Sequence, residues 1–251
     1  MHKNLGGYCG EGIDIGVVLA DARAVAEQKG WQADVLRTDD GVELLALRRT
    51  APAPRRRLYV STGIHGDEPA GPLALRQLLR EDRWPADVDL WLCPCLNPAG
   101  FPLNCRASAS GLDLNRDYQH LQSGEVRAHV AWLDQQPPFD LTLCLHEDWE
   151  AEGFYVYELN PDHRPSLAEK IIAAAATVCP IDLAPEIEGR AARGGIIRPD
   201  LDPALRTHWP EAFYLIQRQT RLCYTLEAPS DFPLPVRVAA LVAAARAAME
   251  G

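Results

Sequence analysis

RLYVSTGIHGDEPAGPLALRQLLRE, residues 57–81, decides the fold class of this chain. Its first residues form an apolar run that is typical of a buried strand, and its last twelve have the spacing of an amphipathic helix. Gly63 and Gly66 allow a sharp turn between the two elements. The stretch therefore predicts a strand, a tight turn and a helix, and the turn holds His65 and Glu68 three residues apart.

The same alternation of strands and helices continues on both sides of this unit. Alternating strands and helices predict a layered α/β domain with a mostly buried sheet, and no segment has the composition of a linker. We therefore expect a single domain over residues 1–251. Other strands are expected within 32–49, 88–97, 139–146, 153–159 and 221–229, helices at 16–30, 123–136, 164–179 and 234–250, and irregular structure at 180–210.

Polar residues follow four of these apolar strands at the point where each strand ends. In open α/β sheets, ligands bind beyond the carboxyl ends of the strands, so these residues are candidates for one site. They are His65 and Glu68 after the first strand, Asn97 after the second, His146, Glu147 and Asp148 after the third, and Glu227 after the fourth.

Two imidazoles and one carboxylate are the usual protein ligands of a catalytic zinc ion, which keeps a fourth position open for water. His65, Glu68 and His146 supply this set, and we expect one Zn²⁺ per chain. Hydrolysis then needs a separate carboxylate that takes a proton from the attacking water and passes it to the leaving amine. Glu227, at the end of a buried strand, suits that task. Each residue alone would be better explained as a helix cap or a hydrogen-bonded strand end, but the four together favour a metal site.

A second H-x-x-E sequence occurs at 208–211, so one of the two copies is expected to be accidental. His208 and Glu211 follow no predicted strand, and Pro210 stiffens the stretch between them. We therefore predict that the second copy is a surface turn.

The polar segment 97–118 is a long connection, and such connections are more often functional than idle. It contains Arg106 and Arg116, whose guanidinium groups are suited either to bind a substrate carboxylate or to stabilise an oxyanion. Three later arginines have no comparable context and are expected to be solvated surface charges. They are Arg190, Arg193 and Arg198.

Four motifs in this order resemble the zinc carboxypeptidases of the funnelin type, whose scaffold is shared by the succinylglutamate desuccinylase and aspartoacylase branch. The resemblance implies a three-layer α/β sandwich with a mixed, mostly parallel sheet of about eight strands, helices on both faces and zinc at the sheet edge. The motifs are GIHGDEPAG (63–71), NPAGFPLNCRASASGLDLNRDY (97–118), LCLHED (143–148) and YTLEAPS (224–230).

The resemblance also implies roles for individual residues. His65, Glu68 and His146 match the zinc ligands of the family, and Glu227 matches its general base. The pair Asn115 and Arg116 matches the residues that hold the C-terminal carboxylate of the substrate, and Arg106 matches the arginine that stabilises the tetrahedral intermediate.

These roles imply a metallocarboxypeptidase that cleaves the C-terminal peptide bond of peptides. Two alternatives on the same scaffold remain open, namely an N-acyl amino acid deacylase and a murein-peptide amidase. Each of these substrates carries a free carboxylate. A non-catalytic binding protein on a decayed enzyme fold is a fourth possibility, which the intact ligand set and Glu227 disfavour.

The chain departs from the digestive enzymes of this family in one segment. Those enzymes carry a tyrosine followed by a Gly-Gly pair upstream of the general base. Here Gly194 and Gly195 are present without the tyrosine, and Tyr214 is the nearest later candidate. The acidic sequence HEDWE raises a second question, because Asp148 and Glu150 would either bind a second metal or a basic side chain, or act as hydrogen-bonded strand-end carboxylates, which we favour.

Charge, apolar runs and cysteine spacing limit the expected partners and cell compartment of this chain. A formal charge of −10 disfavours nucleic acid, which requires a basic surface. No apolar run reaches the roughly 18 residues of a membrane span, and the first residues lack a signal-peptide core. The seven cysteines have no zinc-ribbon spacing, so we expect buried, reduced thiols in a cytoplasmic protein.

Overall fold

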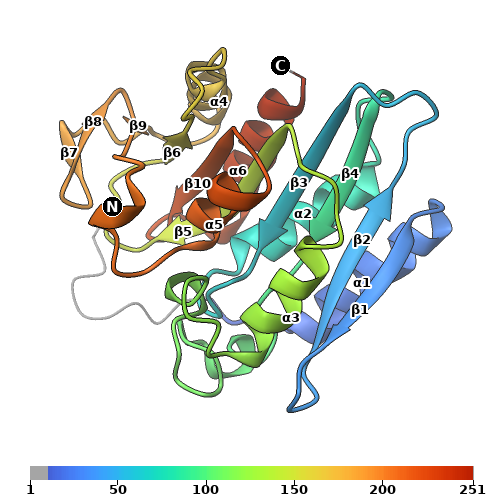
Figure 1. Cartoon of the computed structure of the whole chain (residues 1–251). Coiled ribbons are helices and arrows are strands. Elements are labelled where there is room, and N and C mark those ends of the chain that lie inside the picture. Colours follow the sequence, from blue (N-terminus) through green and yellow to red (C-terminus); the bar gives the residue numbers. More distant parts are fainter. Residues whose placement is uncertain (1–10, 251) are drawn as a thin grey trace.

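Helices cover both faces of a mixed β-sheet in the computed structural model, which describes residues 11–250 (Figure 1). The predicted three-layer α/β fold is confirmed, but the described residues form ten strands instead of about eight. The strands are β1 (Gln32–Arg37), β2 (Glu43–Arg49), β3 (Arg56–Thr62), β4 (Val88–Cys93), β5 (Leu141–Asp148), β6 (Tyr155–Leu159), β7 (Glu186–Ile187), β8 (Arg190–Arg193), β9 (Ile196–Ile197) and β10 (Cys223–Pro229). The α-helices are α1 (Ile15–Gln28), α2 (Ala70–Glu81), α3 (Gly124–Leu133), α4 (Ala168–Ala175), α5 (Glu211–Arg218) and α6 (Leu234–Met249).

The strand order explains how distant parts of the chain meet. The order across the sheet is β1-β2-β4-β3-β5-β10-β6-β9-β8-β7. The four central strands β4, β3, β5 and β10 run parallel to one another, whereas β2 is antiparallel to β4 and β6 is antiparallel to β10. The carboxyl ends of β3, β5 and β10 therefore lie side by side at one edge of the sheet.

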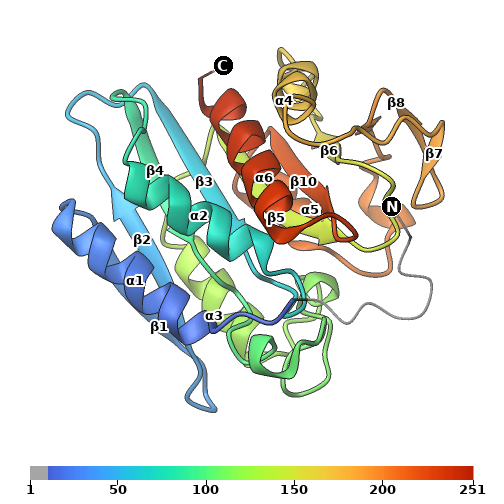
Figure 2. The ribbon, with the colours of Figure 1, turned by 180° about the vertical axis from the view of Figure 1, so that it is seen from behind.

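Side-chain alternation along β5 divides the core into two halves. Leu143 and Leu145 face the layer that contains α1, α2 and α6, which Figure 2 shows from behind. Cys144 faces the opposite layer, in which α3 and α5 pack. By the same alternation, His146 projects toward the α3 and α5 side and Glu147 toward the α2 and α6 side.

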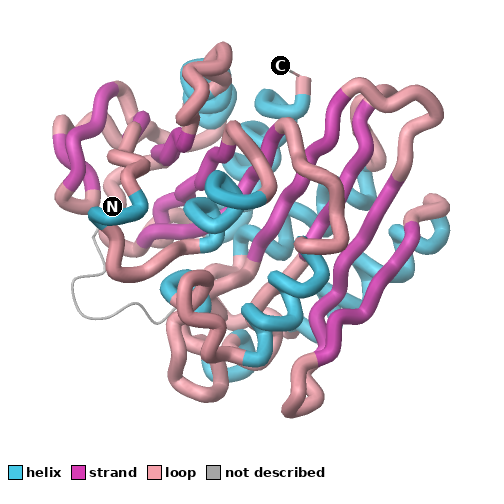
Figure 3. The backbone as a smooth tube through the Cα atoms, viewed as in Figure 1, coloured by secondary structure: helices cyan, strands magenta, loops and turns pink. Residues whose placement is uncertain are grey.

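The predicted elements match the structure except where local patterns are weak. Residues 180–210, predicted to be irregular, contain the three short strands β7, β8 and β9, and the smoothed backbone in Figure 3 shows strand segments in this region. Strands of two to four residues carry no readable periodicity. Of these three strands, β9 pairs with β6, β8 pairs with β9, and β7 pairs with β8. The helix α5 was also missed, and α4 is shorter than the predicted 164–179.

The structure also bears on membrane-spanning helices and on the cysteines. None of the helices within 11–250 is both long and apolar enough to cross a membrane. Among the described cysteines, Cys105 is exposed, so the expectation of uniformly buried thiols was wrong there; Cys93, Cys95, Cys144, Cys179 and Cys223 are buried and free.

Candidate metal centre and substrate pocket

The turn after β3 places His65 and Glu68 under the carboxyl end of the sheet. Gly63 has a φ of +62°, which favours glycine, and Gly66 packs so closely that a Cβ atom would lie 2.2 Å from the carbonyl carbon of Gly100. Each glycine is therefore required for a different reason, the first by conformation and the second by contact.

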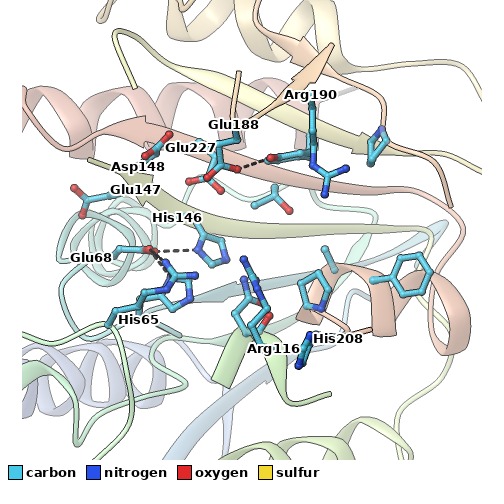
Figure 4. Close-up of a pocket in the computed structure, with 18 of the residues that line it drawn as sticks. His65, Glu68, Arg116, His146, Glu147, Asp148, Glu188, Arg190, His208 and Glu227 are labelled. Atoms are coloured by element: carbon cyan, nitrogen blue, oxygen red, sulfur yellow. Dashed lines mark hydrogen bonds and ion pairs between the residues drawn. The ribbon is translucent and has the colours of Figure 1, made fainter. Parts of the chain in front are cut away.

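Three side chains converge at this point from two strand ends. Both imidazoles direct Nδ1 at the Glu68 carboxylate: His65 contacts Oε1 closely, and His146 lies 3.0 Å from Oε2. The two rings are 5.1 Å apart between centroids, and all three residues are buried. The candidate ligand atoms lie within 4.8 Å of one another, and Figure 4 shows them meeting at one side of the pocket.

The electrostatics of this cluster suit a bound cation. Although burial opposes it, the two imidazoles hold the pKa of Glu68 well below its usual range, so Glu68 is ionised. Burial lowers the pKa of His146 despite the nearby carboxylate, which favours the neutral imidazole that binds metals, whereas Glu68 and Asp113 raise the pKa of His65 against the effect of its burial. Two imidazoles and an ionised carboxylate are the donor set of catalytic zinc, and the residues present therefore fit that ion.

Asp113 links His65 to Arg106 and was not predicted as a site residue. Its Oδ1 lies 3.4 Å from His65 Nε2, and its Oδ2 accepts a hydrogen bond of 3.0 Å from Arg106 Nε. Metal-binding histidines commonly contact a carboxylate through their second ring nitrogen, which fixes the orientation of the ring. The guanidinium group of Arg106 is thereby held 3.8 Å from Glu68, at the edge of the ligand cluster.

Glu227 lies beside the cluster on β10, and its backbone pairs with that of His146. Residues paired across adjacent strands project to the same face, so the Glu227 carboxylate shares the pocket with the three candidate ligands (Figure 4). Burial, with repulsion from Glu68, Glu188 and Asp148, raises the pKa of Glu227 well above its ordinary value. A raised pKa suits a group that must accept and return a proton near neutral pH.

Asn115 and Arg116 reach the same pocket from a 3₁₀ turn, Leu114–Arg116, in the long connection. The Asn115 Oδ1 atom accepts a 2.8 Å hydrogen bond from the backbone N–H of Glu211. Its amide nitrogen is therefore left as the donor available to a ligand. Arg116 is exposed, and one of its nitrogens donates to the carbonyl of Asn115 at 2.9 Å.

The pocket is a cavity of about 520 Å³, and its wall carries two arginines that were not predicted as site residues. Arg190, which is exposed as expected for a solvated charge, also lines this pocket (Figure 4). Arg206 also lines it, with its guanidinium group 4.3 Å from the centroid of Phe213. Arg206 carried no sequence signal, because it lies in the segment expected to be irregular.

In the second H-x-x-E sequence, the histidine is exposed and the glutamate is buried. His208 is exposed at the pocket rim, but Glu211 begins α5 and is fully buried. Its carboxylate accepts hydrogen bonds of 2.9 Å from the hydroxyls of Tyr59 and Ser61. The prediction of a surface turn was therefore wrong for Glu211, because the chain returns to the sheet at this residue.

The structure also shows where the remaining acidic and tyrosine candidates, Asp148 and Tyr214, lie. Asp148 accepts hydrogen bonds from the backbone N–H of Glu150 at 2.8 Å and from Tyr155 Oη at 3.1 Å, as favoured for a strand-end carboxylate. Tyr214 lies outside the pocket and donates to Asp134 at 3.0 Å. Tyr157 is the one tyrosine among the described residues that line the pocket.

The sequence of residues 54–188 matches the family model described as the succinylglutamate desuccinylase/aspartoacylase catalytic domain. This segment is more than half of the 251-residue chain. The chain belongs to the succinylglutamate desuccinylase/aspartoacylase family. Carboxypeptidase SOL1 of Arabidopsis thaliana is 33% identical over an alignment of 107 residues, with coverage of 33% of this chain and 21% of that protein. The match thus spans about one fifth of that relative's length.

Solved structures of other proteins share the fold of this chain. A candidate metallopeptidase from Shewanella amazonensis SB2B has a TM-score of 0.80 at 24% identity, over 93% of this chain and 91% of that chain. A metallo-carboxypeptidase from Burkholderia cenocepacia has a TM-score of 0.72 at 19% identity, over 96% and 70%. A metallo-carboxypeptidase from Pseudomonas aeruginosa, in complex with (2-guanidinoethylmercapto)succinic acid, has a TM-score of 0.67 at 21% identity, over 94% and 68%. The resemblance inferred from the motifs is confirmed.

Proposed function

We propose that this protein is a zinc-dependent metallocarboxypeptidase that hydrolyses the C-terminal peptide bond of peptides. The observation that carries the proposal is the shared pocket, in which Glu227 and two substrate-binding candidates surround the three candidate ligands. A zinc ion held by His65, Glu68 and His146 would lower the pKa of its bound water to about 7 and polarise the scissile carbonyl.

The chain's own residues divide the remaining work. Glu227 takes the proton of the attacking water and returns it to the leaving amine. Arg106 stabilises the negative charge that develops on the carbonyl oxygen, and Asp113 holds the guanidinium group in place for this task. Arg116 and the amide nitrogen of Asn115 bind the terminal carboxylate and so fix which bond is cleaved.

The arginines of the pocket favour a substrate with more than one carboxylate. No carboxylate within residues 11–250 forms an ion pair with Arg116, Arg190 or Arg206. Burial, and then repulsion from Arg190 and Arg116, lowers the pKa of Arg206, whose Nε atom has no hydrogen-bond partner in the described part of the chain. Such a group of cations gains most from an anionic ligand. We infer that the leaving residue has an acidic side chain.

The family match specifically favours a second candidate, an N-acyl amino acid deacylase. The same residues would then hold an acidic amino acid while a small acyl group is removed. Two exposed apolar side chains, Trp149 and Leu205, line the pocket and offer contacts to residues upstream of the cleaved bond. A small acyl group would not make these contacts, and we therefore rank the peptide substrate first.

Product profiling of the zinc-loaded enzyme separates the two candidates. The substrates are a peptide ending in glutamate, its C-terminally amidated form, and N-acetyl- and N-succinylglutamate. We expect release of free glutamate from the unblocked peptide at the highest kcat/KM. A preference for the N-acyl amino acids would identify a deacylase, and no release from any free acid would contradict both functions.

A further inference from the structure

A buried ion pair lies directly behind the candidate metal centre, on the opposite face of the sheet. Glu147 follows the candidate ligand His146 on β5, and alternation turns its side chain toward α2 and α6. There the carboxylate contacts Arg237 Nη1 of α6, and both side chains are buried. A second nitrogen of Arg237 contacts Glu11, which lies near the beginning of the described chain.

The same carboxylate also holds the first turn of α2. Its Oε1 accepts a 2.5 Å hydrogen bond from the backbone N–H of Ala70, the first residue of that helix. The residue before the helix, Pro69, provides no side-chain cap, so Glu147 takes the role of the capping carboxylate. Ala70 follows the candidate ligand Glu68 by two residues.

One carboxylate therefore connects the backbones that carry two of the three candidate ligands. Through Glu147, the end of β5 with His146 is tied to the start of α2 with Glu68. Arg237 fixes the position of this carboxylate from α6, with two guanidinium nitrogens directed at two different carboxylates. Removing Arg237 would leave Glu147 as a buried carboxylate without this partner, and its bond to Ala70 would have to change.

We propose that Arg237 is a positioning residue for the metal centre, acting through Glu147 on the relative placement of Glu68 and His146. The inference rests on the proposed metal site but not on the proposed substrate. Partners that orient metal ligands typically change metal affinity by about 10- to 100-fold when they are mutated.

The test compares Arg237→Met with Arg246→Met in the full-length protein. Arg246 lies further along the same helix and pairs with Glu81 at the other end of α2, so it controls for general loosening between α2 and α6. Zinc dissociation constants are measured by chelator competition, and the visible spectrum of the cobalt-substituted protein reports ligand geometry. We expect Arg237→Met to weaken zinc binding by about 10- to 100-fold and to alter the cobalt spectrum, while Arg246→Met changes neither.

The double variant Glu147→Gln/Arg237→Met keeps the test valid if Arg237→Met does not fold. This variant removes both buried charges and keeps an amide oxygen that can accept the hydrogen bond from the backbone N–H of Ala70. Neutral replacements of buried ion pairs are often tolerated, so this variant should fold. We expect its zinc affinity to fall by at least about tenfold. The proposal would be overturned if this double variant bound zinc as tightly as the wild type. It would also be overturned if Arg237→Met and Arg246→Met lost zinc affinity equally. A wild-type protein that binds no zinc would instead contradict the metal site itself.

Discussion

Glu227 pairs with His146 across the parallel strands β10 and β5, so a candidate base and a candidate metal ligand project from adjacent positions on one face of the sheet. The strand pairing fixes their relative position, although 81 residues of sequence separate them (227 − 146). A rigid sheet can hold such a pair more accurately than a loop.

Glu227→Gln should abolish turnover and leave zinc binding intact. Glutamine preserves the side-chain volume but cannot take a proton from water, and general acid–base groups are typically worth about 10²–10⁴-fold in rate. Steady-state kinetics and metal analysis on the same sample check both parts. Loss of zinc from Glu227→Gln would mean that Glu227 is a ligand.

The two H-x-x-E sequences should differ in metal binding. Purified protein should hold about one zinc per chain in an open three-ligand site. His65→Ala should remove most of this zinc because it deletes a buried candidate ligand, whereas His208→Ala should leave it in place. Metal content by atomic emission after dialysis decides the matter. Equal zinc loss in both variants would contradict the choice of His65.

Arg116→Ala should damage recognition of the free C-terminal carboxylate. Removing one partner of a desolvated charged pair typically costs about 2–5 kcal/mol, which would appear in kcat/KM. The wild type should therefore discriminate strongly against C-terminally amidated peptides, and the variant should lose most of this discrimination. If the wild-type enzyme cleaves amidated peptides as well as free acids, no terminal carboxylate is being recognised.

Arg190→Ala should reduce the preference for an acidic leaving residue. Hydrogen bonds to charged groups contribute about 1.5–3 kcal/mol, so we expect the kcat/KM ratio of Glu- to Gln-terminated peptides to fall by roughly 10- to 150-fold. Arg193→Ala is a matched control, because Arg193 is exposed on the same strand and does not line the pocket. An unchanged ratio in Arg190→Ala would contradict the inferred acidic substrate.

Glu211 should make the protein less stable as the pH rises from about 4.5 to about 7. Burial raises its pKa from 4.5 to about 7, although hydrogen bonds from Ser61, Tyr59 and Cys144, and the charge of His65, oppose the shift. The folded state therefore holds a proton that the unfolded state releases, and the stabilisation is full below pH 4.5 and lost above pH 7.

The check is chemical denaturation of wild type and Glu211→Gln across this pH range. Glutamine resembles the protonated acid, so its stability lacks this dependence. The stability of the wild type relative to the variant should fall by up to about 3 kcal/mol between pH 4.5 and pH 8. A constant difference would mean that Glu211 stays ionised throughout.

The α/β class, the strand–turn–helix unit and most of the residues that meet at the candidate metal centre are predictable from the residue pattern alone. Strand periodicity and glycine requirements are local properties, and the carboxyl ends of parallel strands necessarily gather at one edge. His65, Glu68, His146 and Glu227 all lie at such ends, and this is why the sequence suffices to assemble them.

Tertiary structure alone decided the position of residues outside regular strands. Arg190 lies on β8, which joins the sheet through β9, and Arg206 follows a short 3₁₀ turn; both line the pocket, and segments this short carry no periodic signal. Glu211 is buried because α5 begins against the sheet. No local sequence pattern predicted this burial. Glu147 and Arg237 meet across 90 residues of sequence, since such a contact follows from how α6 packs against the sheet and not from the residues beside either partner.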